Sequence, residues 1–253
     1  MSTHAMSTEH REPSFIRKYI FSTDHKTIGL QFLFTTLIFL SIGGALAMLI
    51  RTQLAWPFEQ IPGIGKLLYS EGDGTLLPEQ YIGLVTMHGT IMIFFFIIPM
   101  LSGAFGNFLI PLQIGARDMA FPRLNLLSYW ILWPAFIMIL LAMFIEGGPP
   151  SAGWTSYAPL SALPNAVPGS GTGQSLWLVS LLFVGAGSIM GALNYITTIL
   201  LMRAPGMHLF RMPMTTWALL ITATLVLLAT PVLTSALILL ILDRSVGTHF
   251  FLP

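Results

Sequence analysis

The sequence LVTMHGTIMIFFFIIPM, Leu84 to Met100, decides the fold of this chain. Its one titratable side chain is His88, and the other residues are apolar or uncharged. A helix that crosses a bilayer needs about 20 apolar residues, and the apolar segment around this stretch is longer than that. Burying an imidazole in such a segment costs free energy unless the ring has a polar partner. His88 is therefore the first candidate functional residue.

The whole chain has the composition of a membrane protein. Of its 253 residues, 55% are hydrophobic and 8% are charged, whereas an ordinary soluble domain is about one quarter charged. Because a spanning backbone must satisfy its own hydrogen bonds, we predict an all-α fold, a polytopic membrane helical bundle. A cytoplasmic tail is expected over residues 1–27 and the transmembrane bundle over residues 28–253. The five predicted spans are Ile28–Ile50, Tyr81–Pro111, Leu124–Ile145, Leu176–Met202 and Met214–Leu242.

The charges of the predicted loops indicate the orientation in the membrane. Loops rich in Lys and Arg stay in the cytoplasm. These residues are Arg11, Arg17, Lys18 and Lys26 in the tail, Arg117 and Arg123 after the second span, and Arg203 and Arg211 after the fourth. The loop 146–175 has neither Lys nor Arg. We expect the N-terminus inside, and five spans then put the C-terminus outside.

Several classes of function are excluded by composition. The chain has no cysteine, so disulfides and thiolate metal sites cannot form. Its net charge of +1 gives no indication of nucleic-acid binding. The tail lacks the short apolar core of a secretory signal peptide, so we expect none.

Two alternatives remain open for His88 from its position. It lies about 10 Å below the outer surface of the predicted second span. There the imidazole either bonds a carbonyl or hydroxyl of a neighbouring helix or binds a metal, haem iron above all. Gly89 beside it either admits a flat macrocycle or allows close helix packing. Arg51 and Tyr81, on the same outer side, either contact polar groups of a cofactor or anchor the helices at the interface.

A second group of polar residues lies towards the inner side. If its asparagines converge, they frame a wet mouth with Asp118 as the collecting carboxylate, because such side chains hold ordered waters along proton pathways. Equally, Asp118 is a solvated loop acid, and the asparagines are helix caps or interhelical hydrogen-bonding groups. The other members are Asn107, Asn125, Asn194 and Ser188.

Seven strings of the chain resemble subunit I of haem-copper oxidases, the A-type cytochrome c oxidase branch. They occur in family order from Phe21 to the C-terminus. They are FSTDHKTIGL, MHGTIMIFF, GNFLIPLQIGARDMAFPRLN, GWTSYAPL, ALNYITTI, PVLTSALILLILDR and THFF. The resemblance implies that the five spans belong to the twelve-helix fold of that subunit.

The resemblance also implies roles for individual residues. His88 matches the ligand of the low-spin haem, a haem of type a. Arg51 matches the arginine that bonds that haem's polar substituent, and Tyr81 and Trp154 match residues near its propionates. Asp118 matches the acid at the entrance of the D proton pathway. Asn107, Asn125, Asn194 and Ser188 match residues farther along that pathway.

The chain departs from the family pattern at a few positions. Quinol-oxidising relatives have an acid and a histidine where this chain has Ala55 and Gln80, which favours cytochrome c as the electron donor. Gln53 stands where some members have a cation-binding acid, so no calcium or sodium site is expected there. Gly187 replaces one of a pair of serines in the upper pathway.

The resemblance predicts part of the catalytic subunit of a proton-pumping terminal oxidase, in a bacterial cytoplasmic or mitochondrial inner membrane. Ligands of the high-spin haem and copper belong to family segments beyond Pro253, and we expect the remaining histidines of this chain not to replace them. The expected partners are the remainder of subunit I, subunits II and III, cytochrome c and membrane lipids. Alternatives are a non-catalytic truncated homologue, an assembly or interaction module, a quinol oxidase or a transporter.

Overall fold

The computed structural model describes residues 14–68, 72–145 and 147–252, and within these ranges it contains helices and turns but no strand. Its five helical segments are long and apolar enough to cross a membrane, which confirms the predicted helical bundle. They are His25–Ala55, Pro78–Ile114, Pro122–Leu141, Thr172–Leu201 and Met214–Ser245. Our prediction for the tail residues 1–13 lies outside the described residues.

The first two spans begin at residues that are typical of helix N-termini. Helix α1 (His25–Ala55) starts three residues before the predicted Ile28, because the carboxylate of Asp24 accepts the N–H of Thr27 at 2.9 Å. Helix α3 (Pro78–Thr90) opens with a proline, whose missing N–H costs nothing at that position.

The second span is not a uniform α-helix. After α3 it continues as two wide-turned π-helical stretches, η3 (Ile91–Ile97) and η4 (Pro99–Gly106), and then as α4 (Asn107–Ile114). Pro99 cannot donate to the preceding turn, which accounts for an interruption of the α-helical bonding there.

The third span is shorter than predicted. It consists of α5 (Pro122–Trp130) and α6 (Leu132–Leu141), and the break between them precedes Pro134, which cannot donate to the carbonyl four residues earlier. The predicted end at Ile145 is wrong because the helix stops at Leu141. Turns follow it and lead into glycines with positive φ, which a continuing helix does not accommodate.

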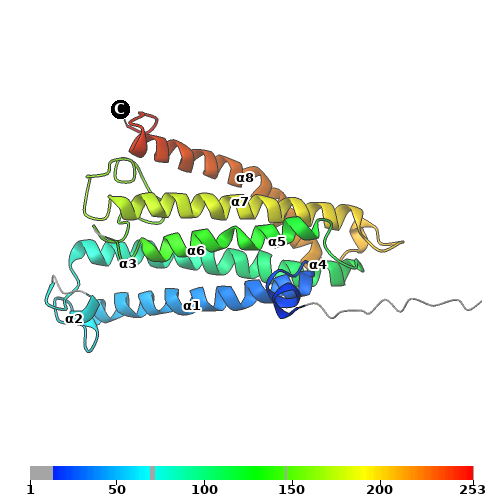
Figure 1. Cartoon of the computed structure of the whole chain (residues 1–253), viewed down its shortest axis with the longest axis horizontal. Coiled ribbons are helices and arrows are strands. Elements are labelled where there is room, and N and C mark those ends of the chain that lie inside the picture. The colour runs from blue at the N-terminus through cyan, green and yellow to red at the C-terminus, as the bar shows by residue number, and fades with distance from the viewer. Residues whose placement is uncertain (1–13, 69–71, 146, 253) are drawn as a thin grey trace, which may run out of the picture.

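The last two spans are α7 (Thr172–Leu201) and α8 (Met214–Ser245), joined by a loop that contains the short helix η5 (Leu209–Arg211). Helix α8 lies at the edge of the bundle: 11% of its most apolar window is buried, against 44% in α7. Pro231 interrupts its backbone hydrogen bonds. The C-terminal half of α8 diverges from α7 (Figure 1).

Three phenylalanines join the first three spans at the centre of the core. Phe39 of α1, Phe95 of η3 and Phe136 of α6 have ring centroids 4.6 to 5.6 Å apart and are almost fully buried. Such tilted aromatic pairs stabilise a core beyond the area that they bury. The spans run lengthwise side by side, and the start of α1 and the C-terminus lie at opposite ends (Figure 1).

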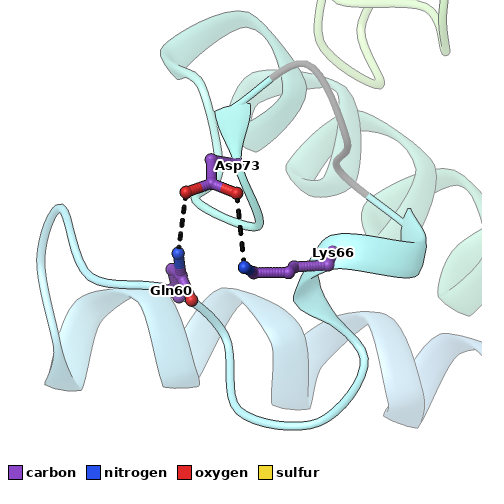
Figure 2. A network of polar contacts seen from close by, with 3 residues as sticks. All are labelled: Gln60, Lys66 and Asp73. Atoms are coloured by element: carbon purple, nitrogen blue, oxygen red, sulfur yellow. Dashed lines mark hydrogen bonds and ion pairs between the residues drawn. The ribbon is translucent and has the colours of Figure 1, made fainter.

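The loop between α1 and α3 contains the short helix α2 (Gly65–Leu68) and a small polar network (Figure 2). The carboxylate of Asp73 accepts a hydrogen bond from Gln60 at 3.0 Å and pairs with Lys66 at 3.5 Å. Both charged side chains are largely exposed, so this ion pair contributes little to stability.

Candidate functional site

His88 has a defined partner and a defined tautomer. Its Nδ1 lies 2.9 Å from the backbone carbonyl oxygen of Gly43 on α1. A carbonyl only accepts, so Nδ1 carries the hydrogen, and the neutral ring keeps its lone pair on Nε2. Within the described residues, no group bonds Nε2. The ring is therefore oriented by α1 and retains one nitrogen that can bind a metal.

The absence of a side chain at Gly43 lets the two helices approach at this level. A Cβ atom there would lie 2.6 Å from the sulfur of Met92 and 3.4 Å from Ile91. Real Cβ atoms do not tolerate the first distance, so a larger residue at position 43 would displace the Met92 side chain and crowd Ile91 on the second span.

Trp154 lies against Gly89, the residue that follows His88. A Cβ at Gly89 would be 3.2 Å from Cδ1 of the indole. The same loop is tied to α3 because the N–H of Gly153 donates to the hydroxyl of Thr86 at 3.1 Å. Close packing, the second alternative for Gly89, therefore accounts for this glycine, and it brings Trp154 to the helical turn of His88.

Arg51 and Tyr81 lie farther out on the same two helices. Along α1, Arg51 is about 12 Å beyond Gly43, and along α3, Tyr81 is about 10 Å beyond His88. Arg51 is exposed, whereas Tyr81 is half-buried against the core. Neither side chain forms a hydrogen bond within the part of the chain that the structure describes. Of the residues predicted to surround His88, Trp154 lies against the helical turn that carries His88. Arg51 is exposed farther along α1 and does not lie at that turn.

Arg244 holds the loop that carries Trp154, and the sequence analysis did not identify it. Its guanidinium donates to the carbonyls of Ser161 (2.8 Å), Ser170 and Gly171 (2.7 Å), and to the hydroxyl of Ser175 (3.1 Å). An arginine in the last turn of an apolar span is a weak signal, because it usually anchors the helix end at the interface. Its partners are loop carbonyls that no local pattern identifies.

At the end of the bundle where α1 begins, Asp118 is half-buried between the second and third spans. One of its oxygens accepts the N–H of Met119 at 2.6 Å. Burial raises the pKa of this carboxyl, while the Met119 hydrogen bond and the attraction of His25 oppose the rise. A carboxyl of this kind takes up and releases a proton more readily near neutral pH than a solvated one.

His25 connects α1 to this cluster. It falls within the predicted tail (residues 1–27), but it is the first residue of α1 and is 2% exposed. Its Nδ1 donates to the carbonyl of Asn107 at 2.8 Å, and its charge acts on Asp118. The capping sequence TDHKT was the available signal, because it indicates that the helix begins before Ile28.

Two of the predicted asparagines have buried polar atoms without partners. Asn107 donates to the carbonyl of Gly103 at 2.7 Å, but its side-chain oxygen bonds nothing within the described residues. Both polar atoms of the Asn125 amide are likewise unpaired there. Buried amide atoms of this kind are commonly satisfied by ordered water.

Asn194 has a different environment and bonds the loop that follows Asp118. Its side chain accepts the N–H of Phe121 at 2.9 Å and donates to the carbonyl of the same residue at 3.3 Å. Thr198, one turn later, accepts the N–H of Ala120 at 2.9 Å. Interhelical hydrogen bonding, one of the alternatives for the asparagines, therefore describes Asn194.

Ser188 lies apart from the inner cluster, on the wall of a cavity of about 200 Å³. The lining is mostly apolar and comes from all five spans, through α1, η3, η4, α5, α6, α7 and α8. Its polar members include Ser102, Ser128, Ser188 and Thr222.

Within the described residues, no three side chains of His, Asp or Glu gather as a metal site. The one imidazole of His88, with Nε2 unbonded and Nδ1–H fixed, therefore suits a metal whose other ligands do not come from these residues. This is the donor arrangement of an axial haem ligand.

Comparisons with known proteins identify the family that this chain is similar to. A family model described as "Cytochrome C and Quinol oxidase polypeptide I" matches residues 27–253. Cytochrome c oxidase subunit 1 of Synechocystis sp. is 46% identical over 98% of the chain, and that of Thermostichus vulcanus 45% over 93%. A probable cytochrome c oxidase subunit 1-beta of Nocardia farcinica is 45% identical over 95%. The chain covers 41%, 39% and 38% of these relatives' own lengths.

Proposed function

Because this chain belongs to the cytochrome c and quinol oxidase polypeptide I family, we propose that it forms part of the catalytic subunit of a terminal oxidase that reduces oxygen to water. It is an integral membrane protein with five spans of sufficient length and apolarity. The observation that carries the proposal is the Nδ1–Gly43 hydrogen bond of His88, which leaves Nε2 for a haem iron.

His88 would hold the low-spin haem, a haem of type a, from one side. When bound, that haem would accept and pass on one electron at a time. The Gly43 carbonyl fixes the direction of the ring and raises the basicity of Nε2. Trp154 packs on the same turn, against Gly89. Arg51 and Tyr81, nearer the outer surface, are suited to the haem's polar substituents.

The inner cluster would admit protons. Asp118 is half-buried with a raised pKa, which suits a group that collects protons. The unpaired amide atoms of Asn107 and Asn125 provide sites for the waters of a pathway. Asn194 would hold the entrance loop in place, and Ser188 would belong to the upper part of the same pathway, towards the cavity.

The remaining features of the proposal concern the complete enzyme. Its partners would be the remainder of subunit I with the high-spin haem and copper, subunits II and III, and cytochrome c. Ala55 and Gln80 favour cytochrome c over quinol. The distribution of Lys and Arg favours an N-terminus on the proton-uptake side.

A redox difference spectrum of the purified membrane complex that contains this chain tests the proposal. We expect haem bands and oxygen consumption driven by reduced cytochrome c but not by a quinol. A complex without porphyrin would contradict the oxidase assignment and favour an assembly module or a transporter. Oxygen consumption with quinol alone would overturn the choice of electron donor.

A further inference from the structure

The segment before α1 forms a small structure of its own, which we call the N-terminal turn (residues 14–21). It contains the π-helical η1 (Ile16–Ile20). The chain folds back along α1, and the side-chain amide of Gln31 donates to the carbonyls of Tyr19 (2.6 Å) and Ile20 (2.8 Å). This explains a polar residue near the start of a membrane span: the Gln31 amide satisfies carbonyls that η1 leaves free.

The N-terminal turn is amphipathic, and both kinds of side chain are exposed. Phe15, Ile16 and Tyr19 are 69%, 56% and 48% exposed, and the rings of Phe15 and Tyr19 are 5.0 Å apart. Arg17 and Lys18 lie between them in sequence and are also exposed. Three large apolar side chains directed away from the protein are unfavourable in water but stable at the boundary of a bilayer.

The position of the turn identifies the medium around it. Gln31 is about 9 Å along α1 from His25, where the spanning helix begins. Because Gln31 bonds Tyr19 and Ile20, the N-terminal turn lies beside the first turns of the span. In a bilayer, that depth corresponds to the boundary between acyl chains, which accommodate the apolar side chains, and phosphates, which attract the two cations.

We propose that the N-terminal turn is an in-plane anchor that binds anionic phospholipids through Arg17 and Lys18, with Phe15, Ile16 and Tyr19 in the acyl boundary. Charge complementarity selects this occupant, since two adjacent cations at the headgroup level attract anionic lipids. The inference does not depend on the oxidase assignment.

Lipid selectivity provides the first test. In vesicles of phosphatidylcholine, the complex that contains the full chain is probed with spin-labelled phosphatidylglycerol and spin-labelled phosphatidylcholine. The variant with Arg17→Gln and Lys18→Gln should lower the preference for phosphatidylglycerol by about two-fold or more. The matched control, Arg123→Gln with Arg211→Gln, removes two exposed cations at the same end of the bundle and should change it less. An equal loss in the control, or no loss in the first variant, would overturn the proposal.

Depth measurements provide the second test, and the absence of cysteine makes single labels straightforward. Ile16→Cys and Arg17→Cys are each spin-labelled and exposed to oxygen or a nickel chelate. An anchor predicts that the label at position 16 favours oxygen and the label at position 17 favours nickel. Nickel access at both positions would place the turn in water. Access of neither reagent would show that another protein chain covers it. Either result overturns the proposal.

Discussion

The Nδ1 atom of His88 and the carbonyl oxygen of Gly43 lie 2.9 Å apart, on two helices and 45 residues apart in sequence. This bond fixes the tautomer of the imidazole and directs its other nitrogen away from α1. Metal-binding histidines commonly donate their second N–H in this manner, and the partner tunes both orientation and basicity. The buried imidazole of His88 requires a polar partner, and the Gly43 carbonyl of α1 is one such partner.

Enlarging Gly43 should weaken haem binding. The Cβ of Gly43→Val would begin 2.6 Å from the Met92 sulfur, and the two methyl groups beyond it would crowd Met92 and Ile91 beside the carbonyl that orients His88. Loss of an outer partner of a metal ligand typically lowers metal affinity by about 10 to 100-fold, so we expect a reduced haem-to-protein ratio. Gly44→Val is the matched control, because no atom of the described residues lies within 4 Å of a Cβ there. Equal haem loss in both variants would contradict the packing explanation.

Gly89 and Trp154 should be energetically coupled. Gly89→Ala places a methyl group 3.2 Å from the indole, and overpacking of this kind costs about 1–3 kcal/mol. The cost should largely disappear in a Trp154→Ala background. Thermal unfolding of the two single variants and the double variant measures the coupling. If Gly89→Ala had the same effect in both backgrounds, Trp154 would not be its partner.

The spans and the candidate haem ligand could be predicted because both depend on local chemistry. Apolar runs specify helices in a membrane, and a lone histidine such as His88 stands out within one. The end of the third span could not be predicted so well, since the apolar run from Leu141 to Ile145 continues past the last helical turn. There, turns and the glycines with positive φ end the helix although the sequence is still apolar.

Residues whose roles depend on distant partners were not recognised. From sequence alone, His25 is assigned to the tail. In the structure, the Asp24 cap starts α1 at His25, and the hydrogen bond to the Asn107 carbonyl holds His25 in the bundle. From sequence alone, Arg244 is an interface anchor, whereas in the structure it bonds three loop carbonyls and the hydroxyl of Ser175 in the first turn of α7. Asn125 and Asn194 look alike in sequence. Among the described residues, however, the side-chain amide of Asn125 has no partner, whereas that of Asn194 bonds the loop at Phe121.

Removing the amide of Asn194 should loosen the loop after Asp118. Asn194→Ala leaves the backbone N–H of Phe121 without its acceptor, which costs about 1–3 kcal/mol. We expect faster hydrogen exchange at the amide of Phe121. Thr197→Val is a suitable control, because among the described residues the hydroxyl of Thr197 bonds only its own helix, at Leu193. Unchanged exchange in Asn194→Ala would show that the loop is held by other contacts.

Asp118 should make stability depend on pH in a definite direction. Its pKa in the folded chain is raised above the ordinary 3.8 by burial, so the folded state binds the proton more tightly than the unfolded chain. The stabilisation from protonation is therefore present below pH 3.8 and is lost as the pH rises through the folded pKa. Asp118→Asn should raise the melting temperature at neutral pH and have no such effect in acid. A lower melting temperature at neutral pH would mean that attraction by His25 dominates.

The same substitution distinguishes a proton-collecting acid from a loop acid. On the proposed function, Asp118→Asn slows proton uptake by the reconstituted complex while its haem content stays unchanged. A variant that takes up and pumps protons at the normal rate would indicate that Asp118 has no part in proton entry.

The most direct test of haem binding by His88 is the redox difference spectrum of the complex with His88→Ala, recorded beside His208→Ala, which alters an exposed loop histidine. We predict that the low-spin haem band disappears in the first variant, with the chain still inserted in the membrane, and persists in the second. An unchanged low-spin band in His88→Ala would contradict the assignment of this imidazole to the iron.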